Sequence, residues 1–158
     1  MIERYQEVDL NDKIIGEYKT VWPDMISGKY MLKKYNSGKD LFVPFLTGVF
    51  RKSHYEKVGG FSSKALSPDL FLWLKLTAIG NFSFINRSVG RYMIHQSSLS
   101  QSPDPMLQIL DIKMLGLVED FFKNMNQLNK FERKHLKRIK RFIIRRYHSQ
   151  IIKSIFLR

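Results

Sequence analysis

The stretch that decides the fold of this chain is Gly59-Gly60-Phe61-Ser62-Ser63-Lys64-Ala65-Leu66-Ser67-Pro68-Asp69-Leu70-Phe71-Leu72-Trp73. After a glycine turn, Ser67 stands where a helix is capped, Pro68 at the first helical position and Asp69 in the first turn. The residues that follow are apolar on nearly every side, which predicts a buried helix that ends at Gly80. Asp69 also suits the positive end of the helix dipole, so a purely structural role would explain it.

The segments around this stretch predict a mixed α/β body. Two short β-forming runs on either side of a polar turn predict a hairpin, and an apolar run that contains a proline predicts a buried strand entered through a loop. A Ser-x-x-Glu spacing predicts a capping box and a short helix that stops at a glycine. The expected elements are strands at 4–9 and 13–19, a helix near Lys29–Tyr35, a strand within Leu41–Phe50, a helix opened by Ser53 and Glu56 that ends at Gly59, and strands at Phe82–Ile85 and Arg91–His95.

The pattern changes after Pro103 and Pro105, where apolar residues begin to recur at three- and four-residue steps. This period predicts one long helix, and a second helix is expected from Phe131 onward. We therefore divide the chain into an α/β domain over residues 1–102 and a helical, basic extension over residues 103–158. The predicted apolar faces are Leu107, Leu110, Met114, Leu117, Phe121 and Met125 in the first helix, and Ile139, Phe142, Ile143, Ile151 and Ile155 in the second.

Composition excludes several classes of protein. An apolar content of 44% and an aromatic content of 13% are too high for a disordered tail. The chain has no cysteine, so it has neither a disulfide framework nor a thiolate metal site. No signal peptide is expected at the N-terminus, and no apolar run approaches the roughly 20 residues that span a bilayer. We expect a cytoplasmic protein.

The net charge of +13 is concentrated at one end of the chain. Residues 130–158 hold 11 Lys and Arg against one acid, which leaves a net charge of +3 for residues 1–129. The body is therefore nearly ordinary in charge, and only the last predicted helix is strongly basic. A general nucleic-acid-binding interpretation of the whole chain is not favoured.

Four segments, taken in order, resemble the C-terminal, acceptor-side half of the family 2 glycosyltransferases, which have the GT-A fold. They are Leu46-Thr47-Gly48-Val49-Phe50-Arg51-Lys52, then Tyr55-Glu56-Lys57-Val58-Gly59-Gly60-Phe61, then Asp69-Leu70-Phe71-Leu72-Trp73-Leu74-Lys75-Leu76 with Gly80, and Tyr92-Met93-Ile94-His95-Gln96-Ser97-Ser98-Leu99-Ser100. The order and spacing of all four are more specific than any one segment.

The sequence departs from the family pattern at two positions. Pro68 stands where the first member of the family's acidic pair is usual, and Met93 replaces the arginine of Tyr-Arg-x-His. The resemblance also implies an N-terminal nucleotide-binding half with an Asp-x-Asp motif, which would precede Met1. We therefore expect a partial GT-A-like mixed sheet with flanking helices, inactive by itself and paired with a second copy or with that half.

Complete relatives transfer a sugar from a nucleotide-sugar donor to a glycan or lipid-linked acceptor. By resemblance, Asp69 occupies the position of the general base that takes the proton of the acceptor hydroxyl. Four of the substrate-binding candidates also have a structural explanation: Trp73 as core, Gly60 as a turn residue, Arg51 as a solvated charge and His95 as a hydrogen-bonded strand end. The substrate-binding candidates are Thr47, Gly48, Arg51, Gly60, Trp73 and His95.

A divalent metal, Mn²⁺ or Mg²⁺, is implied for the complete enzyme, where it would neutralise the departing diphosphate. In some relatives the position of His95 lies near the diphosphate or the metal. No second histidine or carboxylate stands at ligand spacing from His95, so no metal site is expected in this chain alone.

The basic tail supports an alternative function. A basic helix with an apolar stripe can lie on an anionic membrane surface, which would make the chain a non-catalytic membrane- or partner-binding module, peripheral at the inner face of the membrane. A solvated helix that packs on the body through its apolar side explains the same pattern. The residues expected to bind the anionic surface are Lys137, Arg138, Arg141 and Arg145.

Overall fold

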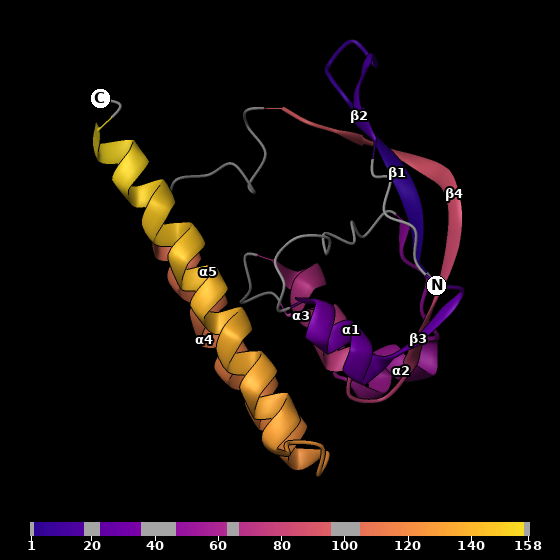
Figure 1. Cartoon of the computed structure of the whole chain (residues 1–158), viewed down its shortest axis with the longest axis vertical. Helices are drawn as coiled ribbons and strands as arrows, with labels where there is room; N and C mark the ends of the chain where they lie inside the picture. The colour runs from indigo at the N-terminus through magenta and orange to yellow at the C-terminus, as the bar shows by residue number, and fades with distance from the viewer. Residues whose placement is uncertain (1, 18–22, 36–46, 63–66, 96–104, 157–158) are drawn as a thin grey trace.

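The computed structural model describes residues 2–17, 23–35, 47–62, 67–95 and 105–156. It has a mixed α/β fold in which a small sheet and three short helices are followed by two long helices (Figure 1). In chain order the elements are β1 Ile2–Val8, β2 Ile14–Glu17, β3 Met25–Ser27, α1 Gly28–Tyr35, α2 Lys52–Lys57, α3 Pro68–Leu76, β4 Asn81–Met93, α4 Pro105–Asn124 and α5 Lys130–Phe156.

The strands are ordered β2-β1-β4-β3, with one parallel pair at the centre. β1 runs antiparallel to β2 and parallel to β4, while β3 pairs antiparallel with the first residues of β4. The two strands predicted at Phe82–Ile85 and Arg91–His95 are wrong as separate elements, because β4 is one strand of 13 residues. The polar stretch between them stays in the strand. The pairing register between β1 and β4 shifts on both sides of Arg4, so β4 accommodates extra residues there as an irregularity of the β-bulge kind.

The predicted N-terminal hairpin is confirmed. The Asp9 carboxylate accepts the backbone N–H of Asn11 at 2.8 Å and that of Lys13 at 3.0 Å. Asp12 takes a positive φ of 61°, a conformation that aspartate tolerates better than most residues. An ion pair between Asp12 and Arg91 ties the turn to β4.

The helix predicted before the double glycine is present, but it is not opened by a capping box. α2 begins at Lys52 with Arg51 at its N-cap, so Ser53 lies inside the first turn. Its C-terminal end follows the prediction: Gly59 and Gly60 have φ of 73° and 60°, and their N–H groups bond the carbonyls of Glu56 and Tyr55. This Schellman arrangement needs residues without a side-chain penalty at positive φ.

α3 begins at Pro68, as predicted, and buries Phe71, Leu72, Trp73, Leu74 and Leu76. It ends at Leu76, not at Gly80, because the Thr77 side chain and N–H both bond the Leu74 carbonyl and tighten the last turn. The predicted helix at Lys29–Tyr35 is also present, as α1. Of the strand predicted at Leu41–Phe50, residues 41–46 lie outside the described part, and residues 47–50 form no strand beyond a bridge at Gly48.

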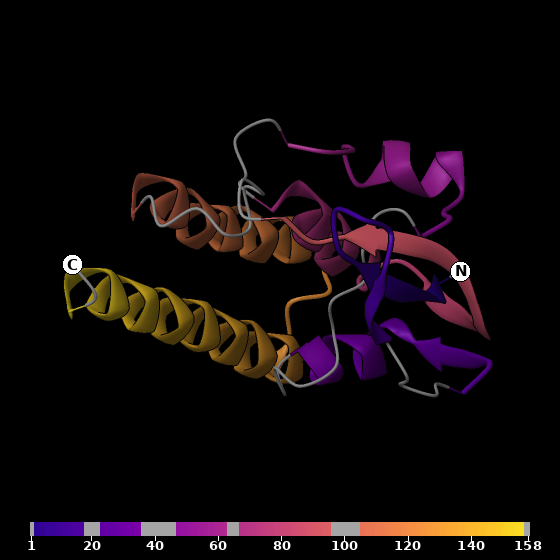
Figure 2. The same ribbon diagram turned by 90° about the horizontal axis from the view of Figure 1, so that it is seen from above.

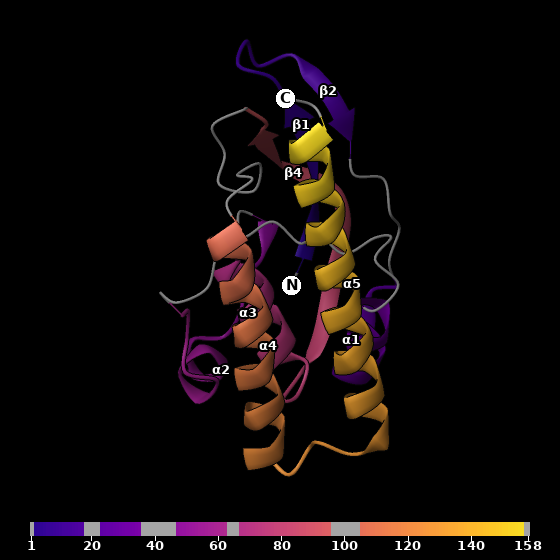
Figure 3. The ribbon, with the colours of Figure 1, turned by 90° about the vertical axis from the view of Figure 1, so that its left-hand side faces the viewer.

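α4 and α5 form an antiparallel hairpin that stands on one side of the sheet, with α3 and α1 between (Figures 2 and 3). The predicted apolar face of α4 is wrong in part, because Leu117 is 55% exposed. The helix has apolar residues on more than one side, and its contacts with α3 and α5 select the buried one. The burial of Leu107 lies outside the described part; within residues 109–124 the buried residues of α4 are Asp111, Met114, Leu115, Val118 and Phe122.

One hydrophobic core joins the body to the helical hairpin. Buried residues of α1, α3 and β4 belong to the same cluster as buried residues of α4 and α5. The core therefore extends across the predicted boundary between residues 102 and 103. In the part of the chain that is described, no helix has the length and apolar character needed to cross a bilayer.

Candidate functional site

Asp69 lies half-buried in the first turn of α3, at the end of the helix that faces away from the α4–α5 turn. Its Oδ1 accepts the N–H of Leu70 at 2.9 Å. Burial raises the pKa of this carboxyl above its ordinary value, and the negative charge of Asp111 adds to the rise. Hydrogen bonds from the backbone N–H groups of Leu70 and of Asp69 itself oppose it.

Asp111 of α4 holds the beginning of α3 in place, a role that sequence reasoning missed. Ser67 is the N-cap residue of α3, but its side chain makes no bond to its own helix. Instead, the Ser67 hydroxyl donates to Oδ2 of Asp111 at 2.9 Å, and the Ser67 N–H donates to Oδ1 at 3.1 Å. Asp111 is 1% exposed, so a buried carboxylate from a different helix fixes the position of Ser67 at the start of α3. The available signal was the position of Asp111 between the apolar residues Leu110 and Ile112.

The Thr47-Gly48 pair is brought against the inner side of α3. Thr47 is buried, and Gly48 lies so close to Trp73 that an added Cβ would be 2.3 Å from the indole Cζ2. Trp73 itself is 2% exposed, with its ring 5.9 Å from that of Phe50 and 6.4 Å from that of Phe82. Trp73 therefore belongs to the core, and Gly48 is needed for this close approach.

Gly60 is fixed by α3 as well. Lys75 of α3 donates from Nζ to the carbonyls of Val58 at 2.6 Å and Gly60 at 2.9 Å. Burial lowers the pKa of this lysine. A Cβ on Gly60 would come within 2.7 Å of the Tyr55 ring. The glycine turn is thus anchored to the same helix that carries Asp69.

The remaining predicted site residues lie apart from these contacts. Arg51 is exposed at the N-cap of α2, and His95 is half-buried just after β4. Among residues 2–17, 23–35, 47–62, 67–95 and 105–156, no group of three or more His, Asp or Glu side chains is arranged to hold a metal ion.

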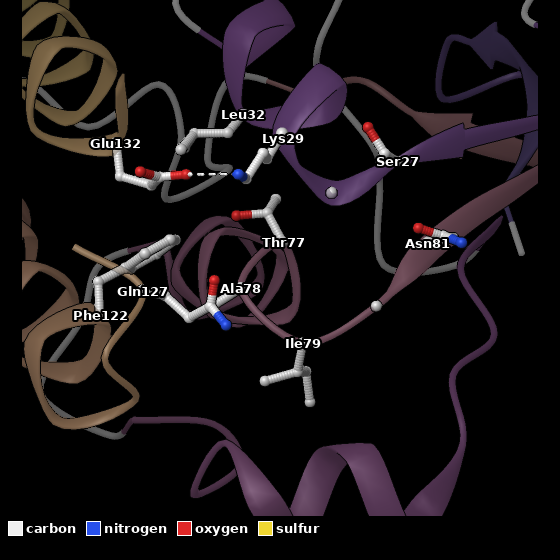
Figure 4. Close-up of a pocket in the computed structure, with 12 residues that line it drawn as sticks. Ser27, Lys29, Leu32, Thr77, Ala78, Ile79, Asn81, Phe122, Gln127 and Glu132 are labelled. Atoms are coloured by element: carbon white, nitrogen blue, oxygen red, sulfur yellow. Dashed lines mark ion pairs between the residues drawn. The ribbon is translucent and has the colours of Figure 1, made fainter. Parts of the chain in front are cut away.

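A pocket of about 360 Å³ lies at the opposite end of α3 (Figure 4). Eight residues separate Asp69 from Thr77, which corresponds to about 12 Å along the helix axis. The pocket opens between the start of α1, the end of α3 and the α4–α5 turn. Its lining residues are Ser27, Gly28, Lys29, Leu32, Thr77, Ala78, Ile79, Gly80, Asn81, Phe122, Gln127 and Glu132.

Glu132 is the buried acid of this pocket, with 2% exposure. It completes a capping box at the start of α5: Asn129 Oδ1 accepts the N–H of Phe131 at 2.8 Å, and Glu132 Oε2 accepts the N–H of Asn129 at 3.3 Å. The Asn-x-x-Glu spacing was the sequence signal for this cap, and it was missed.

The cationic residues predicted on α5 are all exposed. The helix buries the side that holds His135, Leu136, Ile139 and Ile143, together with Glu132. Phe142, which was predicted on the apolar stripe, is 40% exposed, and so is Ile144. In the part of α5 whose side chains the structure describes, residues 130–145, the exposed cations are Lys130, Arg133, Lys134, Lys137, Arg138, Lys140, Arg141 and Arg145.

Comparison of the chain with protein-family models, with curated proteins and with solved structures gave no match. The function therefore has to come from the chemistry of the site.

Proposed function

We propose that this chain is the acceptor-side part of a nucleotide-sugar-dependent glycosyltransferase, with Asp69 as its general base. The observation that carries the proposal is the environment of Asp69: a half-buried carboxyl with a raised pKa, at a helix start that α4 holds rigidly. The resemblance of the segments around Thr47-Gly48, Gly59-Gly60 and Tyr92–Ser100 supports the same function.

The reaction would join an acceptor hydroxyl to the anomeric carbon of the donor sugar. The hydroxyl oxygen forms the new glycosidic bond, its proton passes to the Asp69 carboxylate, and the bond from the anomeric carbon to the nucleoside diphosphate breaks. A general base works best when its pKa approaches the working pH, which burial of Asp69 favours. A divalent metal bound with the donor would neutralise the leaving diphosphate.

The test is acceptor binding by the chain and by its Asp69→Asn variant, and turnover by both when the nucleotide-binding half is supplied. Nucleotide sugars, Mn²⁺ and a panel of glycan and lipid-linked acceptors are supplied, and sugar transfer is followed by mass spectrometry. Asp69→Asn is expected to lower kcat by about 10²- to 10⁴-fold, the usual contribution of a general base, with little change in acceptor binding. Asp120→Asn, an exposed acid of α4, is the matched control and should retain full turnover.

Two results would contradict the proposal. One is turnover that survives Asp69→Asn, since no other residue is proposed to take the proton. The other is the absence of both turnover and acceptor binding in a folded sample across the panel.

The exposed face of α5 favours a second candidate function, binding to an anionic membrane surface. Over residues 130–145 of α5, eight cations are exposed opposite a buried side, and Phe142 and Ile144 provide exposed apolar surface among them. Basic residues next to apolar ones suit a lipid headgroup layer, where each cation contributes about 1 kcal/mol.

Vesicle co-sedimentation tests this candidate. Vesicles with about 30% phosphatidylglycerol should bind the chain, neutral phosphatidylcholine vesicles should not, and Arg138→Glu with Arg141→Glu should weaken binding by about tenfold or more. The matched control reverses the same charge on α2, as Lys52→Glu with Lys57→Glu. Equal binding to neutral vesicles, or a stronger preference for an oligonucleotide, would be evidence against it.

A further inference from the structure

The pocket between α1, α3 and α5 has the properties of a binding site that none of the predicted site residues explains. Its volume of about 360 Å³ falls in the usual range for small-molecule sites, roughly 300–1,000 Å³. Polar groups and apolar side chains share its wall, as in most such sites. Figure 4 shows Glu132 and Lys29 facing each other across one side of it, near the Thr77 hydroxyl.

The pocket is preformed by a close backbone approach. A Cβ on Gly28 would lie 2.0 Å from the Thr77 carbonyl oxygen and 2.7 Å from that of Gly80. Only glycine allows the start of α1 to sit this near to the end of α3. The two helix ends that line the pocket are therefore held at a set separation.

Glu132 and Lys29 leave a gap that suits one kind of chemical group. Oε2 of Glu132 is engaged with the N–H of Asn129, while Oε1 faces Nζ of Lys29 at 4.0 Å. This separation is too long for a direct hydrogen bond. No atom fits on the line between them, but a hydroxyl beside the pair, about 2.8 Å from each atom, would donate to the carboxylate and accept from the ammonium.

The charges of this pair also select against other ligands. A cationic ligand near Glu132 would meet the ammonium of Lys29, and an anionic ligand near Lys29 would meet the buried carboxylate of Glu132. A neutral molecule with several hydroxyls meets neither penalty. Leu32, Ile79 and Phe122 add apolar surface that suits the C–H face of a sugar ring.

We propose that this pocket binds a neutral polyhydroxylated molecule of the monosaccharide class, with one ligand hydroxyl bridging Lys29 Nζ and Glu132 Oε1. Thr77, whose hydroxyl proton is donated to the Leu74 carbonyl at 2.6 Å, keeps a lone pair for a second ligand hydroxyl. The exposed amide of Gln127 lies at the same pocket. The site lies about 12 Å of helix away from Asp69 and does not require Asp69 to act as a base.

The test is an NMR titration of the ¹⁵N-labelled chain with methyl β-D-glucopyranoside, N-acetylglucosamine and myo-inositol. Concentrations reach about 50 mM, which covers millimolar affinities. Saturable shifts are expected for the amides of Gly28, Thr77, Gly80 and Gln127. Choline and acetate are the charged probes, and they should produce no saturable shift there.

Two variants each remove one partner of the bridging hydroxyl. Lys29→Met removes the ammonium at a side chain that is 62% exposed, and Glu132→Gln removes the charge while keeping a residue that fits the capping box. Each should weaken binding by about fivefold or more, the usual loss for one hydrogen bond. Lys33→Met, on the same helix but outside the pocket, and Asp69→Asn should bind within about twofold of the wild type.

The outcomes separate this proposal from the proposed function. Absence of saturable shifts with all three polyols, or unchanged affinity in Lys29→Met, would overturn the pocket proposal whatever Asp69 does. Equal shifts with choline or acetate would overturn the ligand class. Loss of binding in Asp69→Asn would place the sugar at the other end of α3, and so would overturn this site.

Discussion

Two titratable groups with shifted pKa values, the half-buried Asp69 and the buried His135, carry the clearest residue-scale consequences. Burial raises the pKa of Asp69, which means that its carboxylate takes up a proton more readily. This is the property that a general base needs. His135 of α5 is 5% exposed, and its ring centroid lies 4.3 Å from that of Phe131. Burial lowers its pKa, with further lowering from the positive charges of Arg138, Lys134 and Lys33 and an opposing effect of Glu132.

His135 predicts a loss of stability on mild acidification. The neutral imidazole is favoured in the folded state, so below about pH 6.5 the unfolded chain binds a proton that the folded chain does not. The free energy of unfolding should therefore fall as the pH drops from about 6.5 toward the lowered pKa of His135. His135→Phe should show a smaller fall, as measured by urea denaturation at about pH 7.5 and about pH 5. Parallel pH profiles for the two proteins would show that His135 does not contribute.

At the scale of elements, α3 is held by groups that come from distant segments. Asp111 of α4 binds its N-terminal end through Ser67, and Lys75 ties the glycine turn of residues 59–60 to its last turn. At its C-terminal end, Gly28 of α1 packs against the Thr77 carbonyl. The positions of the Asp69 region and of the pocket therefore depend on these contacts between α3 and distant segments, as well as on the sequence of α3.

The Asp111–Ser67 contact predicts a stability effect that an ordinary acid on α4 would not have. Asp111→Ala removes the acceptor of two hydrogen bonds, one from the Ser67 N–H and one from the Ser67 hydroxyl. We expect the free energy of unfolding to fall by about 2 kcal/mol. Asp120→Ala, where the side chain is 60% exposed and pairs with Lys123, should change it by less than about 0.5 kcal/mol. Urea denaturation measures both, and equal effects would argue against the Asp111 contact as the anchor of α3.

At the scale of the whole molecule, the shared core predicts that the body and the helical hairpin unfold together. Tryptophan fluorescence reports on the body, which includes buried Trp73, while far-ultraviolet circular dichroism is dominated by the long helices. The two denaturation curves should coincide. Val118→Ala, at a position of α4 that is 1% exposed, should shift both by the same amount, about 2 kcal/mol.

If the two denaturation curves did not coincide, the body and the helical hairpin would be separate folding units. If Val118→Ala moved only the circular dichroism transition, residues 103–158 would unfold independently of the α/β body. The boundary between residues 102 and 103 would then mark two folding units, and the common cluster would be a weak interface between them.

Local patterns were enough to predict the features that depend on neighbouring residues. Turn residues around Asp9–Asp12 specify a hairpin, Pro68 starts a helix, and glycines at 59–60 end one, because each acts through its own backbone preferences. The same reasoning predicted the long helices and the exposed cations of α5. The capping box at Ser53 was wrong, because the helix starts two residues earlier than the side-chain spacing implied.

Contacts between distant segments decided the rest. Three features depend on partners from 30 or more residues away or on a neighbouring strand. They are the side of α4 that is buried, which holds Asp111 but not Leu117, the continuity of β4, and the approach of Lys29 to Glu132. By itself, the sequence determined the order of elements, the position of Asp69 at a helix start and the basic character of the last helix. Only the tertiary structure decided which face of each helix is buried and which polar groups meet, because the free energy of burial depends on what lies opposite.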